Sequence, residues 1–208
     1  SHGQALAWAL NGNAMVHHFR GEPQAAQQSA EEALTLSTTQ QFALWAAYSP
    51  AILGWALIAQ GNKEQGLVQT QVGLASLRAT GTGLWQSQFM TLLASAYGET
   101  GQIQEGLRVI DEALADSERN GERSYEAELY RLKGTLILQS QASLGQVRTG
   151  QNKSQNIDPR PLTPDSQAEA EAEAWFHKAI TIARGQEAKS WELCTETRLE
   201  RIWKNQGK

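Results

Sequence analysis

The side chains that could carry chemistry in this sequence are few, and none of them falls into a catalytic spacing. His17 and His18 are adjacent, so on a helix they would point about 100° apart and could not easily hold one metal ion. Cys194 is the only cysteine, which excludes an internal disulfide and suggests a structural side chain. The sequence contains no GxxxxGK[ST], GxSxG or HExxH motif. We therefore expect no catalytic residues, no metal and no cofactor.

Two further patterns have ordinary structural explanations. The glycine run Gly81-Thr82-Gly83 is too short to cradle a phosphate and is better explained as a connection between helices. The acidic residues Glu169, Glu171 and Glu173 lie near an expected helix start, where negative charge is favourable. The sequence therefore predicts that this chain is not an enzyme.

The composition limits the partners. The chain has 208 residues, 40% of them hydrophobic and 19% charged, with a formal net charge of −4. This charge gives no basic footprint for nucleic acid or an anionic membrane, and no apolar run is long enough to span a bilayer. No signal peptide is visible at the N-terminus. We expect a cytoplasmic protein that binds neither nucleic acid nor membrane.

The sequence repeats with a period of 40 residues. Four sets of positions share this spacing: Gly21, Gly61 and Gly101; Ala14, Gly54, Ala94 and Gly134; Ala33-Leu34, Gly73-Leu74 and Ala113-Leu114; and Trp45, Trp85 and Tyr125. Within each period, hydrophobic residues recur at helical spacing on both sides of a glycine. Each unit therefore reads as two helices joined by a turn at that glycine.

The period is broken once. Trp191 and Ala179-Ile180 return in frame only after 26 additional residues, and a polar stretch at about 140–165 holds three of the five prolines. We expect a disordered insertion there. The predicted units are 1–40, 41–80, 81–120, 121–186 with the insertion, and an incomplete 187–208, all in a single helical-repeat domain 1–208. The expected helices are 4–20, 23–38, 41–60, 63–79, 84–100, 103–119, 123–139, 165–185 and 189–206.

Small residues recur at one register of each helix, which predicts close helix crossings. On the first helix of each unit they are Ala14, Gly54, Ala94 and Gly134, and on the second they are Ala26, Gly66, Gly106 and Ala172. A glycine inside a helix costs roughly 1 kcal/mol relative to alanine, so its repetition indicates a packing requirement.

With these features the sequence resembles the tetratricopeptide repeat (TPR), most clearly at Ala172, Phe176 and Ala179 in the segment AEAWFHKAITIAR. The resemblance implies an all-α fold: a right-handed superhelical solenoid of antiparallel helix hairpins. The segments ERSYEAELYRLKGTLIL and RLERIWKNQGK also resemble the C-terminal repeat region of large bacterial signalling proteins. Those proteins carry a predicted ATPase region and often an adenylate/guanylate cyclase, a kinase or a transcriptional-regulator domain.

The resemblance further implies that the first helices line a concave groove for a partner. Transferring the register predicts the groove residues Trp8, Asn11, Met15, His18, Tyr48, Trp55, Gln88, Arg131 and Arg201. The predicted function is a scaffold that binds a protein or peptide, including other domains of its own polypeptide. The alternative is a sensor that binds a small effector at the aromatic end of the groove. For Trp8 and Trp55, packing on each other or on a preceding repeat is an equally open interpretation.

Overall fold

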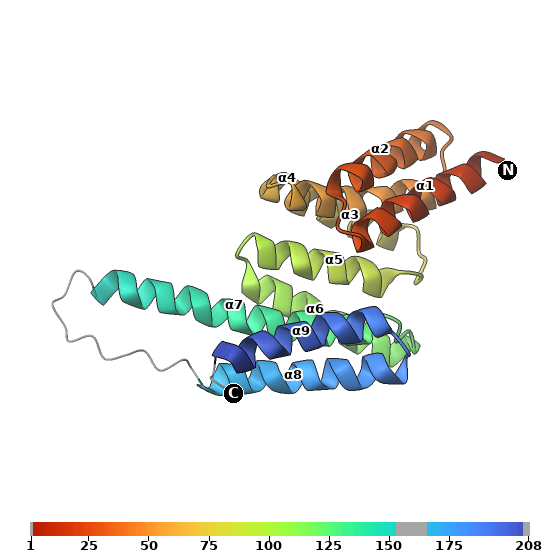
Figure 1. Cartoon of the computed structure of the whole chain (residues 1–208). Helices are drawn as coiled ribbons and strands as arrows, with labels where there is room; N and C mark the ends of the chain where they lie inside the picture. Colours follow the sequence, from red (N-terminus) through yellow and green to blue (C-terminus); the bar gives the residue numbers. More distant parts are fainter. Residues whose placement is uncertain (1, 153–165, 206–208) are drawn as a thin grey trace. The chain divides into compact units, whose positions relative to one another are not determined.

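The computed structural model describes residues 2–152 and 166–205, and all regular structure in that part of the chain is α-helix (Figure 1). The helices are α1 (His2–Phe19), α2 (Pro23–Thr39), α3 (Ala43–Ala59), α4 (Lys63–Ala79), α5 (Gln86–Glu99), α6 (Ile103–Asn120), α7 (Glu126–Asn152), α8 (Ser166–Gly185) and α9 (Lys189–Asn205). They pack as sequential antiparallel pairs, which confirms the predicted all-α class of helical hairpins.

Eight of the nine predicted helices are correct to within two residues, and the exception is α7, which begins three residues later than predicted and ends later as well. The sequence placed that end near residue 139, but the helix continues to Asn152. The sequence of 140–152 is polar, which favoured a loop, but it contains no proline, the residue that breaks a helix most strongly. The structure describes 140–152 as part of α7, and the rest of the predicted insertion lies outside the described residues.

The turns inside the hairpins explain the 40-residue spacing of glycines. Gly61 has a φ of +93°, a left-handed conformation that glycine adopts without strain. Its neighbour Asn62 donates its backbone N–H to the carbonyl of Leu57 at 2.9 Å, which is the bonding pattern of a Schellman helix end. The same bond recurs 40 residues before and after, from Glu22 to His17 and from Gln102 to Tyr97.

The small residues inside the helices mark close crossings, as predicted. At Gly54 in α3, an added Cβ would lie 2.5 Å from the carbonyl oxygen of Gly66 and 2.7 Å from the backbone nitrogen of Thr70 in α4. At Gly134 in α7, it would lie 2.9 Å from the ring of Phe176 in α8. Any larger side chain would force the two helix axes apart.

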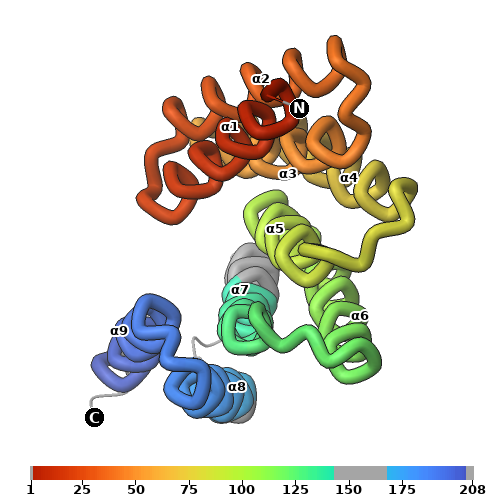
Figure 2. The backbone as a smooth tube through the Cα atoms, turned by 90° about the vertical axis from the view of Figure 1, so that its right-hand side faces the viewer, coloured from red at the N-terminus to blue at the C-terminus, as the bar shows by residue number. Residues whose placement is uncertain are grey.

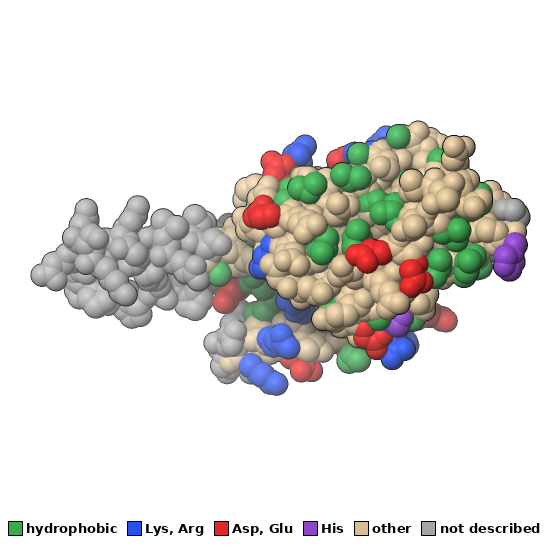
Figure 3. Space-filling model, turned by 90° about the horizontal axis from the view of Figure 1, so that it is seen from above, with side chains coloured by type: hydrophobic (Ala, Val, Ile, Leu, Met, Phe, Trp, Pro, Cys, Tyr) green, Lys and Arg blue, Asp and Glu red, His purple; other side chains and the backbone are tan. Residues whose placement is uncertain are grey.

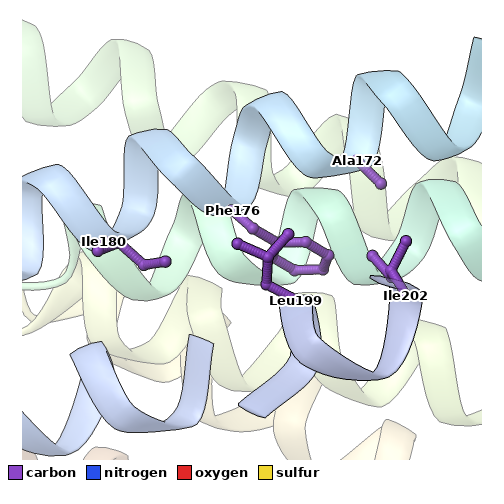
Figure 4. Close-up of a cluster of buried hydrophobic side chains, with 5 residues drawn as sticks. All are labelled: Ala172, Phe176, Ile180, Leu199 and Ile202. Atoms are coloured by element: carbon purple, nitrogen blue, oxygen red, sulfur yellow. The ribbon is translucent and has the colours of Figure 1, made fainter. Parts of the chain in front are cut away.

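The chain forms two compact units, here called the N-terminal unit (residues 1–109) and the C-terminal unit (residues 110–208), with the boundary inside α6. In the N-terminal unit, α2 packs on α1 and α3, and α4 packs on α3 and α5. In the C-terminal unit, α8 packs on α7 and α9 (Figure 2). The core of the C-terminal unit includes Ala172, Phe176 and Ile180 from α8, which meet Leu199 and Ile202 from α9 (Figure 4).

Candidate partner-binding site

The predicted groove residues divide between the two units. Seven belong to the N-terminal unit: Trp8, Asn11, Met15, His18, Tyr48, Trp55 and Gln88. Arg131 and Arg201 belong to the C-terminal unit.

Four of the seven are buried, and they fill the surface that the sequence assigned to a partner. The Tyr48 hydroxyl donates to Gln88 Oε1 at 3.0 Å, and Gln88 Nε2 donates to Met15 Sδ at 3.2 Å. The fourth residue, Asn11, accepts a hydrogen bond from the Ser49 hydroxyl at 2.9 Å. The four side chains link α1, α3 and α5 directly, so they hold the first helices together and leave little surface for a partner to touch.

Aromatic rings extend this packed layer between repeats. Tyr48 meets Trp85 and Phe89 edge to face, at ring centroid distances of 5.5 and 5.0 Å. Trp45 and Trp85, one repeat apart, lie 5.9 Å from each other. In the C-terminal unit, Trp191 contacts Tyr125 at 5.3 Å. The in-register aromatic residues therefore pack between neighbouring hairpins, as predicted.

Trp55 and His18 form a second aromatic contact, between α3 and α1. Their ring centroids are 4.4 Å apart and the rings are nearly perpendicular. Burial lowers the pKa of His18 to about 4, because its charged form would lose hydration. Its Nδ1 is buried and has no hydrogen-bond partner among the described residues. At neutral pH the imidazole is therefore uncharged and supports one side of the Trp55 ring.

Trp55 also borders a cavity of about 440 Å³ between α3 and α5. Its walls combine apolar and polar surface in nearly equal shares. An ion pair lies at the rim, where Lys63 Nζ donates to the Glu99 carbonyl at 2.8 Å and lies 3.4 Å from Glu99 Oε2. The lining residues are Trp55, Ile58, Ala59, Gly61, Lys63, Leu92, Ser95, Ala96 and Glu99. A cavity of this size, lined by apolar side chains together with a few polar groups, is typical of binding sites.

The sequence identified Trp55 but missed the residues around it. Lys63 and Glu99 belong to different helices and meet because both lie at the turn ends of neighbouring hairpins. The 40-residue register contains a usable signal, since Ala59 and Glu99 occupy the same position in successive units and both line the cavity.

Trp8 lies apart from this cavity. Its side chain is 60% exposed, and it borders a separate, more open hollow with Trp45 and Phe42. Trp8 is absent from the lining of the Trp55 cavity, so these two predicted groove residues do not belong to one cavity.

The C-terminal unit has a cluster of three arginines on α7 and α9. Arg131 Nε and Nη2 donate to the two carboxylate oxygens of Glu128, each at 2.6 Å. Burial alone would lower the pKa of Arg131, but the hydrogen bond to Glu128 and the charges of Glu128 and Cys194 together raise it. Arg198 was not predicted, and its pKa is lowered by burial and by the charges of Arg131 and Arg201. Three positively charged side chains therefore act on one another in this cluster, and Glu128 is paired with Arg131.

Other kinds of site are not evident within the described residues. No group of three or more His, Cys, Asp or Glu side chains is arranged to hold a metal ion. Across the same residues, no helix has both the length and the apolar character needed to cross a bilayer.

Comparisons with known proteins place the fold but not the protein's role. No family model matches the chain, and no curated protein matches it. It is similar to the crystal structure of nearly identical TPR-like repeats from a Podosopora anserina protein described as a putative kinesin light chain, with a TM-score of 0.57 and 16% identity over 96% of this chain and 86% of that one. A variant of those repeats gives the same TM-score and identity over 100% of this chain and 99% of that one. The chain thus has the fold of a TPR-like repeat solenoid.

Proposed function

We propose that this chain is an interaction scaffold that binds a peptide or a segment of a partner protein at the Trp55 cavity. The observation that carries the proposal is one half-buried tryptophan that packs against a neutral histidine and lines a cavity with both apolar and polar walls. Large aromatic residues supply contact area at low cost in conformational entropy and are enriched among residues that dominate binding. A hydrophobic side chain of the partner would enter beside Trp55.

The rim of the cavity would orient the bound segment. Lys63 and Glu99 offer a cation and a carboxylate next to the apolar wall, and they already pair with each other. Both side chains are about half exposed, so a partner's backbone or charged group could replace part of this pair at small cost. The site would therefore favour a segment with an apolar residue flanked by polar ones.

The arginine cluster adds a preference for acidic partners in the C-terminal unit. Burial lowers the pKa of Arg198, and repulsion from the charges of Arg131 and Arg201 lowers it further. A carboxylate from a partner would relieve this repulsion through charge-assisted hydrogen bonds. The predicted groove residues Arg131 and Arg201 thus keep their proposed role, with Arg198 added.

The wider setting is proposed on the sequence resemblance. We place the module in a large bacterial signalling protein, in the cytoplasm, where it would bind other domains of the same polypeptide or a separate protein. In this proposal it has no catalytic role of its own and binds neither nucleic acid nor membrane.

The same cavity supports a second candidate, a sensor for a small molecule. Its volume of about 440 Å³ lies within the range of roughly 300–1,000 Å³ that small-molecule sites occupy. The two candidates differ in what crosses the rim, because a peptide must extend past Lys63 and Glu99 whereas a small ligand would stay inside.

A peptide selection distinguishes these candidates. Random 12-residue peptides are selected on the intact chain and counter-selected on the Trp55→Ala variant, and bound peptides are then titrated by fluorescence anisotropy. We expect peptides with a large apolar residue whose affinity is lost in Trp55→Ala and weakened in Lys63→Gln. Peptides that bind both proteins equally would contradict the peptide site. Native mass spectrometry against a small-molecule library, with the same variant as control, tests the sensor.

A further inference from the structure

Basic side chains are distributed unevenly along this chain. The N-terminal unit holds 4 of the 18 Lys and Arg residues, and the C-terminal unit holds the other 14. Figure 3 looks onto the N-terminal unit from above and accordingly shows scattered Lys and Arg side chains on that unit. The C-terminal unit is nevertheless acidic overall, because it also holds 16 Asp and Glu residues. A group of arginines that share a single carboxylate is therefore unusual in this unit.

The arginine cluster of α7 and α9 is such a group. Arg198 and Arg201 are three residues apart, so they lie on one face of α9. The helices α7 and α9 contact each other, and Arg131 of α7 lies close enough to Arg198 for their charges to repel. Glu128 acts on Arg198 in the opposite sense. The three guanidinium groups therefore occupy one region of the surface, with Glu128 among them.

Glu128 is committed to one of the three arginines. Its two oxygens accept hydrogen bonds from Nε and Nη2 of Arg131, each at 2.6 Å. The third nitrogen, Arg131 Nη1, makes no hydrogen bond to any described residue. Arg198 and Arg201 are exposed, and neither has a hydrogen bond or an ion pair with the described part of the chain. All three side chains therefore keep N–H donors that an anion from outside can reach.

The number of charges and donors in the cluster selects the kind of anion. Three arginines and one glutamate leave two positive charges without compensation. A carboxylate brings one negative charge and two oxygens, which satisfy the fork of one guanidinium group. A phosphate monoester brings about 1.5 to 2 negative charges and three acceptor oxygens. It can therefore accept from all three arginines at once and match their excess charge.

We infer that the arginine cluster, with two guanidinium groups on α9 and one on α7, binds the phosphate group of a phosphorylated side chain on a partner protein. This inference rests on the proposed scaffold function, which supplies a polypeptide partner, and it adds a chemical requirement for that partner at the C-terminal unit. Nucleic acid fits less well, because a long polyanion would also meet the excess of acidic residues in this unit. A single phosphate group would meet the cluster alone.

The test compares labelled peptide libraries on the intact 208-residue chain. One library has a central phosphoserine with random residues on both sides, and two matched libraries have serine or glutamate at that position. Binding is measured by fluorescence anisotropy at low ionic strength. We expect the phosphoserine library to bind about tenfold or more tightly than the serine library, because several charge-assisted hydrogen bonds are added. The glutamate library should bind more weakly than the phosphoserine library, because one carboxylate satisfies one guanidinium group.

A matched pair of double variants separates the cluster from the overall charge. Arg198→Gln combined with Arg201→Gln should abolish the preference for phosphoserine. Lys189→Gln combined with Lys204→Gln removes the same charge from the same helix and should keep that preference. All four side chains are exposed, so both variants should remain folded, which thermal unfolding checks. An equal loss of preference in the two variants would mean that overall charge attracts the peptide, and the inference would be wrong.

Two further probes identify other sources of the phosphate group. The inference is wrong if inorganic phosphate stabilises the parent but not the arginine double variant in thermal unfolding, while the phosphoserine and serine libraries bind alike. It is also wrong if single-stranded DNA binds more tightly than the phosphoserine library and loses this binding in the arginine double variant alone. Trp55→Ala separates this site from the cavity, because it should remove binding at the cavity and keep the preference for phosphoserine. A failure of either site is thus visible without the other.

Discussion

The hydroxyl of Tyr48 and the side-chain oxygen of Gln88 lie 3.0 Å apart, although the two residues are separated by a full repeat of 40 positions. Both side chains are buried, so this bond satisfies polar groups inside the N-terminal unit. Tyr48→Phe keeps the ring contacts with Trp85 and Phe89 but leaves Gln88 without its donor. We expect a loss of about 1–2 kcal/mol in the free energy of unfolding, measured by urea denaturation.

A double-mutant cycle isolates that bond from the surrounding packing. The variants are Tyr48→Phe, Gln88→Leu and the two combined. We expect a coupling free energy of about 1 kcal/mol or more, since the residues are in direct contact. Strictly additive losses would mean that the packing of the rings, and not the hydrogen bond, joins α3 to α5.

The helix crossing at Gly54 should be intolerant of even one methyl group. Gly54→Ala places its Cβ against the backbone of Gly66 and Thr70, so we expect a destabilisation of about 1–3 kcal/mol. Gly12→Ala is the matched control, because Gly12 is helical and has free space around it. There the gain in helix propensity should stabilise the chain by roughly 0.5–1 kcal/mol. Thermal unfolding of both variants should show shifts of opposite sign.

Acid should destabilise the N-terminal unit through His18. Its pKa is about 4 in the folded chain and near its ordinary value of 6.5 when unfolded, so the unfolded chain binds more protons between these values. Stability should therefore be complete above pH 6.5 and fall as the pH decreases from 6.5 toward 4, by up to about 3 kcal/mol. His18→Gln should flatten this part of the profile. A variant whose stability falls as steeply as that of the parent would exclude His18 as the cause.

Replacement of Trp55 should affect binding, whereas replacement of Trp85 should affect stability. Trp55→Ala is expected to remove peptide binding with a small change in melting temperature, because the Trp55 side chain is half-buried and lines the cavity. Trp85→Ala should lower the free energy of unfolding by roughly 2–4 kcal/mol, because its ring packs on Trp45 and Tyr48. If Trp55→Ala unfolds the chain to the same degree, Trp55 is a core residue and the cavity loses its role.

Removal of one arginine should stabilise the C-terminal unit at low salt. Arg198→Gln eliminates its repulsion with Arg131 and Arg201 while keeping a long polar side chain. We expect a higher melting temperature at low ionic strength and a smaller difference in high salt, where charges are screened. Arg123→Gln, an exposed change outside the cluster, is the control. A lower melting temperature for Arg198→Gln would mean that the arginine stabilises the unit.

Much of the fold could be predicted because the same structural signals recur in successive repeats. Gly61 and Gly101 mark turns through a backbone conformation that few other residues adopt, and Gly54 marks a crossing through lack of volume. Such signals can be read from the sequence alone, without knowledge of which residues are neighbours in space. The end of α7 could not be predicted in this way, because a polar sequence such as that of 140–152 does not by itself end a helix.

The site was less predictable for a different reason. The register assigns Tyr48 and Gln88 to the partner-facing side of the first helices, but whether that side is open depends on the length of the side chains there. Tyr48, Gln88 and Met15 are long enough to meet across it, which is a property of three helices together. Lys63 and Glu99 were missed because their pairing depends on how two turns approach in space.

The longer helix α7 has a consequence for how this chain can change over generations. Excision or duplication of a 40-residue block among α1–α4 would rejoin the sequence in phase, so unequal recombination could lengthen or shorten that part of the array at little risk. The hairpin of α7 and α8 is different, because its first helix has 27 residues while α1, α3 and α5 have 14–18. A block cut there would no longer match its neighbours, so this hairpin should be inherited as a single piece while the repeats before it vary in number.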